Sequence, residues 1–211
     1  MTSKIELKLR ELPSEYVTDA DLKVLLPGSR HSHHAQVKRA LAKGYLIRIR
    51  RGLYNQSGYL SHYKPHPFEL AHLIYGPSYV SLESALSFHG LIPEAVYSVT
   101  SVTPRRDKTV KTPYGIFDYL TLPTADFFVG VERIIESPYT FFMATPWKAI
   151  LDYLHCYKKD WVSLEPLIES LRIELDDLPL PKQNEFNELQ SYYQSTRINR
   201  FLRGVEKELL K

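Results

Sequence analysis

The sequence predicts an α+β protein with an N-terminal winged helix-turn-helix, followed by a mixed α+β domain whose C-terminal part is helical. Helical patterns and a basic hairpin pattern fill residues 1–58, whereas strand-like runs alternate with helical patterns after residue 66. Net positive charge is confined to the first of these segments. We therefore expect domains at 1–58 and 67–211, joined by a linker at 59–66.

Positive charge gathers at the N-terminal end of the chain. Residues 1–60 carry 11 Lys and Arg against 5 Asp and Glu, whereas the whole chain carries 27 against 24, which leaves +6 in the first 60 residues and −3 in the remainder. No carboxylate occurs between Asp21 and Glu69, although nine Lys and Arg residues lie there. A local excess of this kind indicates contact with a polyanion.

Three helices are predicted in the first domain. The first is a short amphipathic run that ends at Pro13. The second begins at Thr18 and Asp21, which have the spacing of a capping box, and stops at Pro27. The third is expected to be capped by Ser32 and to end at Gly44, a residue suited to a left-handed stop.

One line of the third helix is polar and the opposite line is largely apolar, at 100° per residue. The polar line consists of Ser32, Gln36, Arg39 and Lys43. The opposite line consists of His34, Val37 and Leu41. Because Ser, Gln, Arg and Lys side chains hydrogen-bond base edges and phosphates, the polar line predicts a helix that reads the major groove of DNA.

Residues 45–54, YLIRIRRGLY, alternate apolar and basic side chains up to a Gly turn, which predicts a β-hairpin. A hairpin after two helices is the wing of a winged helix, and it would lie over the phosphate backbone or the minor groove. The alternatives are a solvated basic face and a protein-binding winged helix. The predicted DNA-binding residues are Arg30, His31, Ser32, His33, Gln36, Lys38, Arg39, Lys43, Arg48, Arg50 and Arg51.

No metal or cofactor site is predicted. His31, His33 and His34 project in different directions from the start of a helix and have no Cys or carboxylate close in sequence. We expect His34 to pack in the core and His31 or His33 to contact phosphate. Cys156 is the one cysteine of the chain, so neither an intrachain disulfide nor a thiolate zinc site can form.

The second domain follows a run from Gln56 to Pro67 that has no hydrophobic period. The predicted elements are helices at 68–74 and 82–90, strands at 96–103 and 115–122 separated by the turn-forming stretch PRRDKTVKTPY, a second strand pair near 134–135 and 139–143, a helix from Thr145-Pro146, and two or three helices from residue 163 to the end. Trp147, Ala149, Ile150, Leu151 and Leu154 are expected to face inward.

No enzyme is predicted. Glu83, His89, Asp118, Lys148 and Asp152 are residue types that catalysis uses, but they form no phosphate loop, nucleophile motif or metal pair. Lys148 and Asp152, four residues apart, are interpreted as a pair on a helix surface. Ser81 and Ser84 are interpreted as helix caps.

Five blocks of sequence occur in a set order: GYLIRIRRGLY, GPSYVSLESALSFHGLIPE, SVTSVTPRR, a G-x-F-x-Y strand from Gly115, and ATPWKAILD. In their order and spacing they resemble the AbiE-type antitoxin family over about residues 18 to 155. The wing motif is matched by Arg48, Arg50, Arg51, Gly52 and Tyr54, and the helix motif by Ser81, Leu82, Ser84, Ala85, Leu86, His89 and Gly90. Trp147 departs from the family, which usually has Glu before the Lys-Ala pair.

The resemblance implies a repressor that binds inverted repeats in its own promoter through the winged helix, and a C-terminal domain that counteracts a nucleotidyltransferase-type toxin. Family precedent includes pairs that counteract each other without a stable complex. Such pairs belong to abortive-infection defence against phage. Within this domain, Ser81, Glu83, Ser84, His89, Lys148 and Asp152 are interpreted as mainly structural. The tail after residue 160 is unmatched.

Two other functions stay open. One is a free-standing transcription regulator whose C-terminal domain senses a ligand or partner, and a neighbouring toxin gene would distinguish it from the antitoxin. The other is a nucleic-acid-processing enzyme, which would need divalent metal. No stretch approaches the ~20 apolar residues of a membrane helix. The first residues, MTSKIELKLRE, are charged and unlike a cleavable signal, so the expected compartment is the cytoplasm.

Overall fold

The computed structural model describes residues 4–12, 14–58, 60–93, 96–123 and 126–209. In this part of the chain the fold is mixed α+β, as predicted, and it contains two sheets. The chain divides into two compact units, Met1–His66 with Thr112–Tyr114 and Pro67–Lys111 with Gly115–Lys211. Pro13, the predicted end of the first helix, and Tyr59, in the predicted linker, lie outside the described residues.

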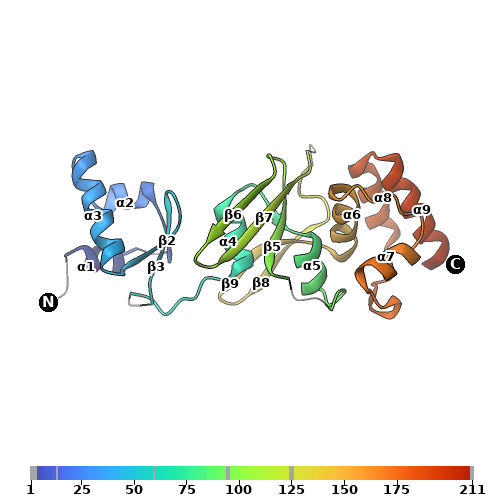
Figure 1. The fold of residues 1–211 in the computed structure, drawn as a ribbon, viewed down its shortest axis with the longest axis horizontal. Helices are drawn as coiled ribbons and strands as arrows, with labels where there is room; N and C mark the ends of the chain where they lie inside the picture. The colour runs from blue at the N-terminus through green and yellow to red at the C-terminus, as the bar shows by residue number, and fades with distance from the viewer. Residues whose placement is uncertain (1–3, 13, 59, 94–95, 124–125, 210–211) are drawn as a thin grey trace. The chain divides into compact units, whose positions relative to one another are not determined.

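The first unit combines three helices with a small antiparallel sheet (Figure 1). Its elements are α1 (Lys4–Arg10), β1 (Tyr16–Thr18), α2 (Asp19–Leu25), α3 (Arg30–Ala42), β2 (Leu46–Arg50) and β3 (Leu53–Gln56). The strand order is β1-β3-β2, and the hairpin of β2 and β3 is the one predicted. The strand β1 was not predicted, because three residues are too few to show a period of two.

The core of the first unit draws on every helix. Leu9 of α1, Leu22 of α2 and Val37 of α3 are buried together with Leu46 and Tyr54 of the hairpin. The capping box of α2 is confirmed: Asp21 N donates to Thr18 Oγ1 at 3.2 Å and Thr18 N donates to Asp21 Oδ2 at 2.8 Å. The bond from Thr18 N, and a second from the Thr18 hydroxyl to Asp21 Oδ2 at 2.7 Å, lower the pKa of Asp21, because they favour the charged carboxylate.

The predicted start of α3 was wrong. The N-cap is Ser29, not Ser32, and its hydroxyl accepts a hydrogen bond from Ser32 N at 3.3 Å. Ser29 has the extended backbone of a cap, whereas Ser32 already lies in the first turn. The helix therefore begins at Arg30, which brings Arg30 and His31 onto it. Gly44 follows the helix with φ +70°, in the left-handed region expected there.

We predict that Ser29→Ala lowers the free energy of unfolding by about 1 kcal/mol, because it removes the cap of α3. Ser32→Ala is the matched control, since among the described residues the Ser32 hydroxyl accepts a bond only from half-buried Gln36, at 3.2 Å. Urea unfolding followed by circular dichroism measures both. Equal losses for the two variants would contradict the assignment of Ser29 as the cap.

The second unit is built on a six-stranded sheet with the strand order β6-β7-β5-β4-β9-β8. Its elements are α4 (Pro67–Ile74), β4 (Tyr79–Val80), α5 (Leu82–Phe88), β5 (Ser98–Thr103), β6 (Lys108–Thr112), β7 (Gly115–Thr121), β8 (Val131–Glu136), β9 (Tyr139–Ala144), α6 (Pro146–Cys156), α7 (Glu165–Leu171), a 3-10 turn (Leu175–Asp177), α8 (Gln183–Tyr193) and α9 (Thr196–Leu209). The stretch predicted as a turn contains the edge strand β6, because lysine and threonine suit an exposed edge.

The strands β5 and β7 pair in parallel, and their register separates the two faces of the sheet. Thr100 lies opposite Asp118, and Ser101 lies opposite Tyr119, so these two pairs point to opposite faces. Tyr119 donates a hydrogen bond to Ala71 O of α4 at 2.7 Å, so α4 covers the face that carries Tyr119. Helix α5 lies on the other face, where Ser84 N donates to Thr100 Oγ1 at 3.0 Å.

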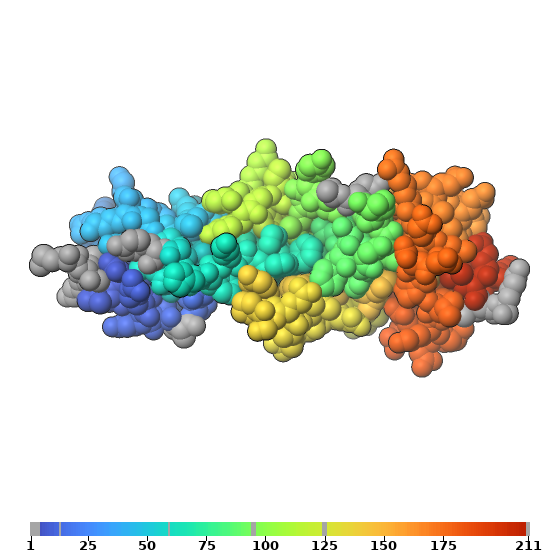
Figure 2. Space-filling view, turned by 90° about the horizontal axis from the view of Figure 1, so that it is seen from below, coloured from blue at the N-terminus to red at the C-terminus, as the bar shows by residue number. Residues whose placement is uncertain are grey.

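Helix α6 joins the sheet to the helices that follow it. The helix opens at Thr145-Pro146 as predicted, with Thr145 as its N-cap. Trp147, Ala149, Ile150, Leu151 and Leu154 are all buried, as expected. Trp147 Nε1 donates to Pro179 O at 3.0 Å, and its ring packs edge-on against Phe186 of α8. The helices α7–α9 gather at the C-terminal end of the unit, orange to red in Figure 2.

Candidate nucleic-acid interface

The orientation of α3 follows from its buried residues. His33, Val37 and Ala40 face the core at spacings of four and three. The opposite crest of the helix therefore carries His31, Ala35, Lys38 and Ala42, and of these His31, Lys38 and Ala42 are exposed. The crest therefore presents one cation, Lys38, beside the small side chains of Ala35 and Ala42. Small side chains allow this face of the helix to approach another molecule closely.

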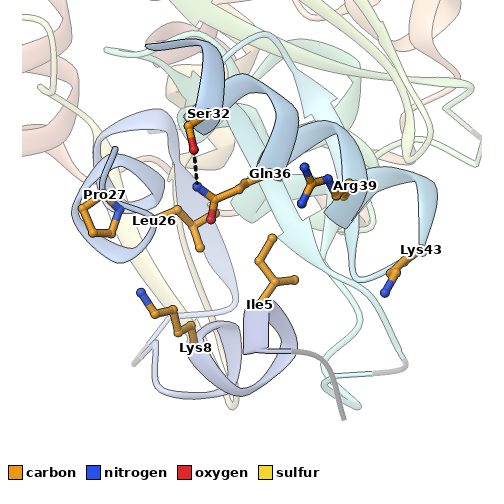
Figure 3. Close-up of a pocket in the computed structure, with 8 residues that line it drawn as sticks. All are labelled: Ile5, Lys8, Leu26, Pro27, Ser32, Gln36, Arg39 and Lys43. Carbon is orange, nitrogen blue, oxygen red and sulfur yellow. Dashed lines mark hydrogen bonds between the residues drawn. The ribbon is translucent and has the colours of Figure 1, made fainter. Parts of the chain in front are cut away.

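The predicted polar line of Ser32, Gln36, Arg39 and Lys43 does lie together, but on one flank of α3 rather than on its crest. Figure 3 shows these four side chains along a groove whose other wall is formed by Ile5 and Lys8 of α1 and by Leu26 and Pro27. Gln36 Nε2 donates to Ser32 Oγ at 3.2 Å. Lys8 Nζ donates to Leu25 O at 2.7 Å, so that ammonium group is anchored beside the C-terminal end of α2.

A second basic groove runs along the other flank of α3, between this helix and the hairpin. It is lined by Lys23, Arg30, His34, Arg48 and Arg51, together with Asp19, Gly28, His33, Val37 and Tyr54. Asp19, the one carboxylate in this lining, accepts a hydrogen bond from the Tyr54 hydroxyl at 3.1 Å. Burial, and then the charge of Asp19, raises the pKa of Tyr54. The groove thus presents four cationic side chains and one carboxylate that is already hydrogen-bonded.

The cations around α3 are not neutralised internally. Among the residues that the structure describes, Arg30, Lys38, Arg39, Arg48 and Arg51 form no ion pair with a carboxylate. All of them except Lys38 line one of the two grooves. Arg50 is exposed at the tip of the hairpin, where its Nη1 donates to Arg51 O at 2.9 Å. Arg30, Lys38, Arg39, Arg48 and Arg51 therefore remain available for an anionic ligand.

His33 and His34 have the opposite burial from the one predicted. His33 is buried at 8% exposure, and its Nδ1 has no hydrogen-bond partner among the described residues, whereas His34 is exposed. The buried face of α3 consists of His33, Val37 and Ala40, whereas the sequence analysis placed His34, Val37 and Leu41 there. His34 replaces His33 as the histidine that can reach a ligand. The sequence did not indicate Lys8, because α1 meets α3 only in the folded unit.

The second notable cluster is a buried ion pair in the second unit. Lys148 and Asp152 were predicted on the surface of a helix, but both side chains are 0% exposed and Lys148 Nζ lies 2.5 Å from Asp152 Oδ1. The surface interpretation was wrong, because the spacing of four residues does not reveal which face of α6 is covered. The sheet covers this face from one side and α8 from the other.

Tyrosines enclose this ion pair. Lys148 Nζ donates to the Tyr79 hydroxyl at 2.7 Å and to the Tyr193 hydroxyl at 3.0 Å. It lies 4.4 Å from the centre of the Tyr192 ring, a cation–π contact. Tyr79 and Tyr193 also donate to Asp152, at 3.1 and 2.7 Å. Burial, followed by the charge of Asp152, raises the pKa of both phenols well above the usual value, and burial lowers the pKa of Lys148.

Ser81 and Ser84 are not helix caps. Ser81 occupies the N-cap position of α5, but its hydroxyl makes no capping bond and instead donates to Asp152 Oδ2 at 2.7 Å. Ser84 Oγ accepts from Thr100 N at 2.8 Å and donates to Ser98 O at 3.3 Å. His89 Nε2 lies 2.8 Å from Ala144 O, within hydrogen-bond distance. These motif residues tie α5 to the sheet and to α6.

The buried network has a structural role and offers little to a substrate. Lys148, Asp152 and Ser81 are fully buried, and their partners come from β4 and α8 as well as α6. Within the described ranges, no three or more His, Cys, Asp or Glu side chains are grouped so that they could hold a metal ion. Nor does any helix there have the length and apolar character needed to cross a membrane.

No protein-family model matches this chain, and the comparison with curated proteins finds no match. The resemblance to antitoxins is therefore supported only by the sequence blocks themselves.

We predict that Lys148→Met lowers the free energy of unfolding by about 3–5 kcal/mol, because it leaves the Asp152 carboxylate buried without its cation. The double variant Lys148→Met/Asp152→Leu should recover much of this loss, since no charge then remains in the core. Denaturant unfolding measures both, with exposed Lys158→Met as the control. A single variant as stable as the control would contradict the network as a stabilising element.

Proposed function

We propose that this protein is a DNA-binding regulator and that its first unit acts as a winged helix on double-stranded DNA. The observation that carries the proposal is the pair of basic grooves on the two flanks of α3. A helix in a major groove lies between two phosphate strands, so cations on both flanks of an exposed crest suit that geometry. The order of helices followed by an exposed basic hairpin also supports it.

Each part of the interface has a distinct proposed role. The crest and its neighbours, Lys38 and Arg39 above all, face the base edges. Arg30, Arg48 and Arg51 on the hairpin side, with Arg50 at the tip, contact phosphate or the minor groove. Direct base contacts confer sequence preference, whereas phosphate contacts confer salt-dependent affinity for any sequence.

We further propose that the chain is an antitoxin that represses its own operon and counteracts a nucleotidyltransferase-type toxin. This step is supported by the order of the sequence blocks between residues 18 and 155, and not by the geometry of the second unit. The alternative is a free-standing transcription regulator. Growth rescue distinguishes the two: an antitoxin relieves the growth arrest caused by expressing the neighbouring toxin gene, and a regulator without a toxin does not.

The DNA proposal is tested by titrating the protein against its own upstream promoter fragment and a shuffled fragment at two salt concentrations. We expect selective binding that weakens with salt. In the Arg48→Ala/Arg50→Ala/Arg51→Ala variant the slope of log K against log salt should become shallower by about 3 if each arginine neutralises one phosphate. Failure of the unmodified protein to bind either fragment would overturn the proposal.

Single variants test the division of roles. Arg39→Ala should weaken binding by about 1–3 kcal/mol and relax base preference, because a base contact is lost. Arg50→Ala should weaken binding to the promoter and the shuffled fragment alike, because a phosphate contact carries no sequence information. The comparison is made on a panel of promoter fragments with single base changes. Sequence-independent losses of equal size at both positions would refute the recognition role of α3.

A further inference from the structure

The half of the large sheet around β7 has one uncovered face. The residues of β7 that point to the α5 side are Ile116, Asp118 and Leu120, and none of these is buried. Ile116 is 38% exposed, whereas Phe117 and Tyr119 on the opposite face are buried under α4. The helices α5 and α6 thus cover β5, β4 and β9 but leave this end of their face open.

A groove runs along this uncovered face. Its lining comes from β5, β6 and β7, from the start of α5 and from the residue after α6, and it includes Glu83, Tyr97, Asp107, Lys108, Asp118 and Tyr157. All of these residues belong to the second unit. Tyr97 is 96% exposed and Tyr157 is 38% exposed, so two aromatic rings are available for contact.

The carboxylates of the groove can accept further hydrogen bonds. Asp118 Oδ1 accepts from Thr109 Oγ1 at 2.6 Å, and Asp107 Oδ1 accepts from Thr121 N at 2.7 Å, which leaves the second oxygen of each for other donors. Burial, and then the charge of Glu83, raises the pKa of Tyr157, and Glu83 Oε2 is buried with no hydrogen-bond partner among the described residues. An ionised carboxylate has about four acceptor sites, so each of these groups accepts fewer hydrogen bonds than it can.

Lys108, the one cation in the groove lining, does not neutralise these acids. Its Nζ lies 4.6 Å from the centre of the Tyr75 ring, and the Arg105 guanidinium lies 5.6 Å from the same ring. Tyr75 packs against Tyr119 on the α4 side of the sheet. Lys108 and Arg105 are thus drawn to the Tyr75 ring, while Glu83, Asp107 and Asp118 line the groove.

We propose that this groove is a docking site for an extended, arginine-bearing segment of a partner protein. A guanidinium pairs with carboxylates through two parallel hydrogen bonds and also stacks on aromatic rings. Arginine side chains can therefore pair with Asp118 and stack on the exposed Tyr97. Tyrosine is also enriched at protein interfaces. A nucleic acid does not fit, because its phosphates would meet three carboxylates. The site lies outside the basic unit, so the inference does not depend on DNA binding.

The probe is a fluorescein-labelled octapeptide of alternating arginine and glycine, titrated against the full chain and followed by fluorescence anisotropy. An alternating glutamate–glycine peptide and the polyamine spermine serve as comparisons. We expect the arginine peptide to bind and the glutamate peptide not to bind. Spermine should displace the arginine peptide only weakly, because it cannot stack on tyrosine or form paired hydrogen bonds. Efficient displacement by spermine would assign the groove to small polycations and overturn the proposal.

Near-isosteric variants locate the binding. Asp118→Asn can still accept from Thr109, and Glu83→Gln keeps the size and shape of a half-buried side chain, so both variants should keep the fold. We expect each to weaken the arginine peptide by about threefold, and the combination with Tyr97→Ala by at least about tenfold. Glu132→Gln, on the exposed strand β8 at the other edge of the sheet, is the control and should have no effect. Binding that is unchanged in the triple variant, or no binding by the unmodified chain, would overturn the proposal.

Discussion

The buried pair of Lys148 and Asp152 is the constraint around which the second unit is organised. Removing two charges from water costs several kcal/mol for each ion, and this cost is offset only when the pair has good geometry and every remaining donor and acceptor is satisfied. Here the ammonium has three hydrogen-bonding partners, and the carboxylate accepts from Ser81, Tyr79 and Tyr193 as well. Strand β4, helix α6 and helix α8 must therefore all be in place before the charges can be buried.

Charged side chains on the surface of each unit also lie in defined places. In the first unit the cations lie on both flanks of α3, and the one carboxylate among them is held by Tyr54. In the second unit Lys108 lies against Tyr75 while its neighbour Thr109 bonds Asp118, because adjacent residues of a strand point to opposite faces. Each unit therefore presents its own kind of charged surface, which is why we assign them different partners.

Patterns that depend on near neighbours were predicted well. The capping box at Thr18, the hairpin with its turn at Gly52 and the inward face of α6 all rest on spacings of a few residues, and the structure has each of them. Errors arose where a local pattern had more than one solution. Ser29 and Ser32 can both cap a helix, and the apolar line of α3 could include Leu41 or Ala40; the packing of α3 against α1 and the hairpin selects between them.

The amino-acid sequence by itself determined the α+β class, most helices and strands, and the basic character of the N-terminal region, because these follow from composition and short-range periodicity. Only the tertiary structure decided that β5 and β7 pair in parallel, that α3 turns its crest rather than its polar line outward, and that Lys148 and Asp152 lie in the core. Tyr79 and Tyr193 are 69 and 45 residues from Lys148 in sequence, so no local pattern could reveal the contacts that bury it. Burial depends on which segments fold over a residue, and that is a property of the whole unit.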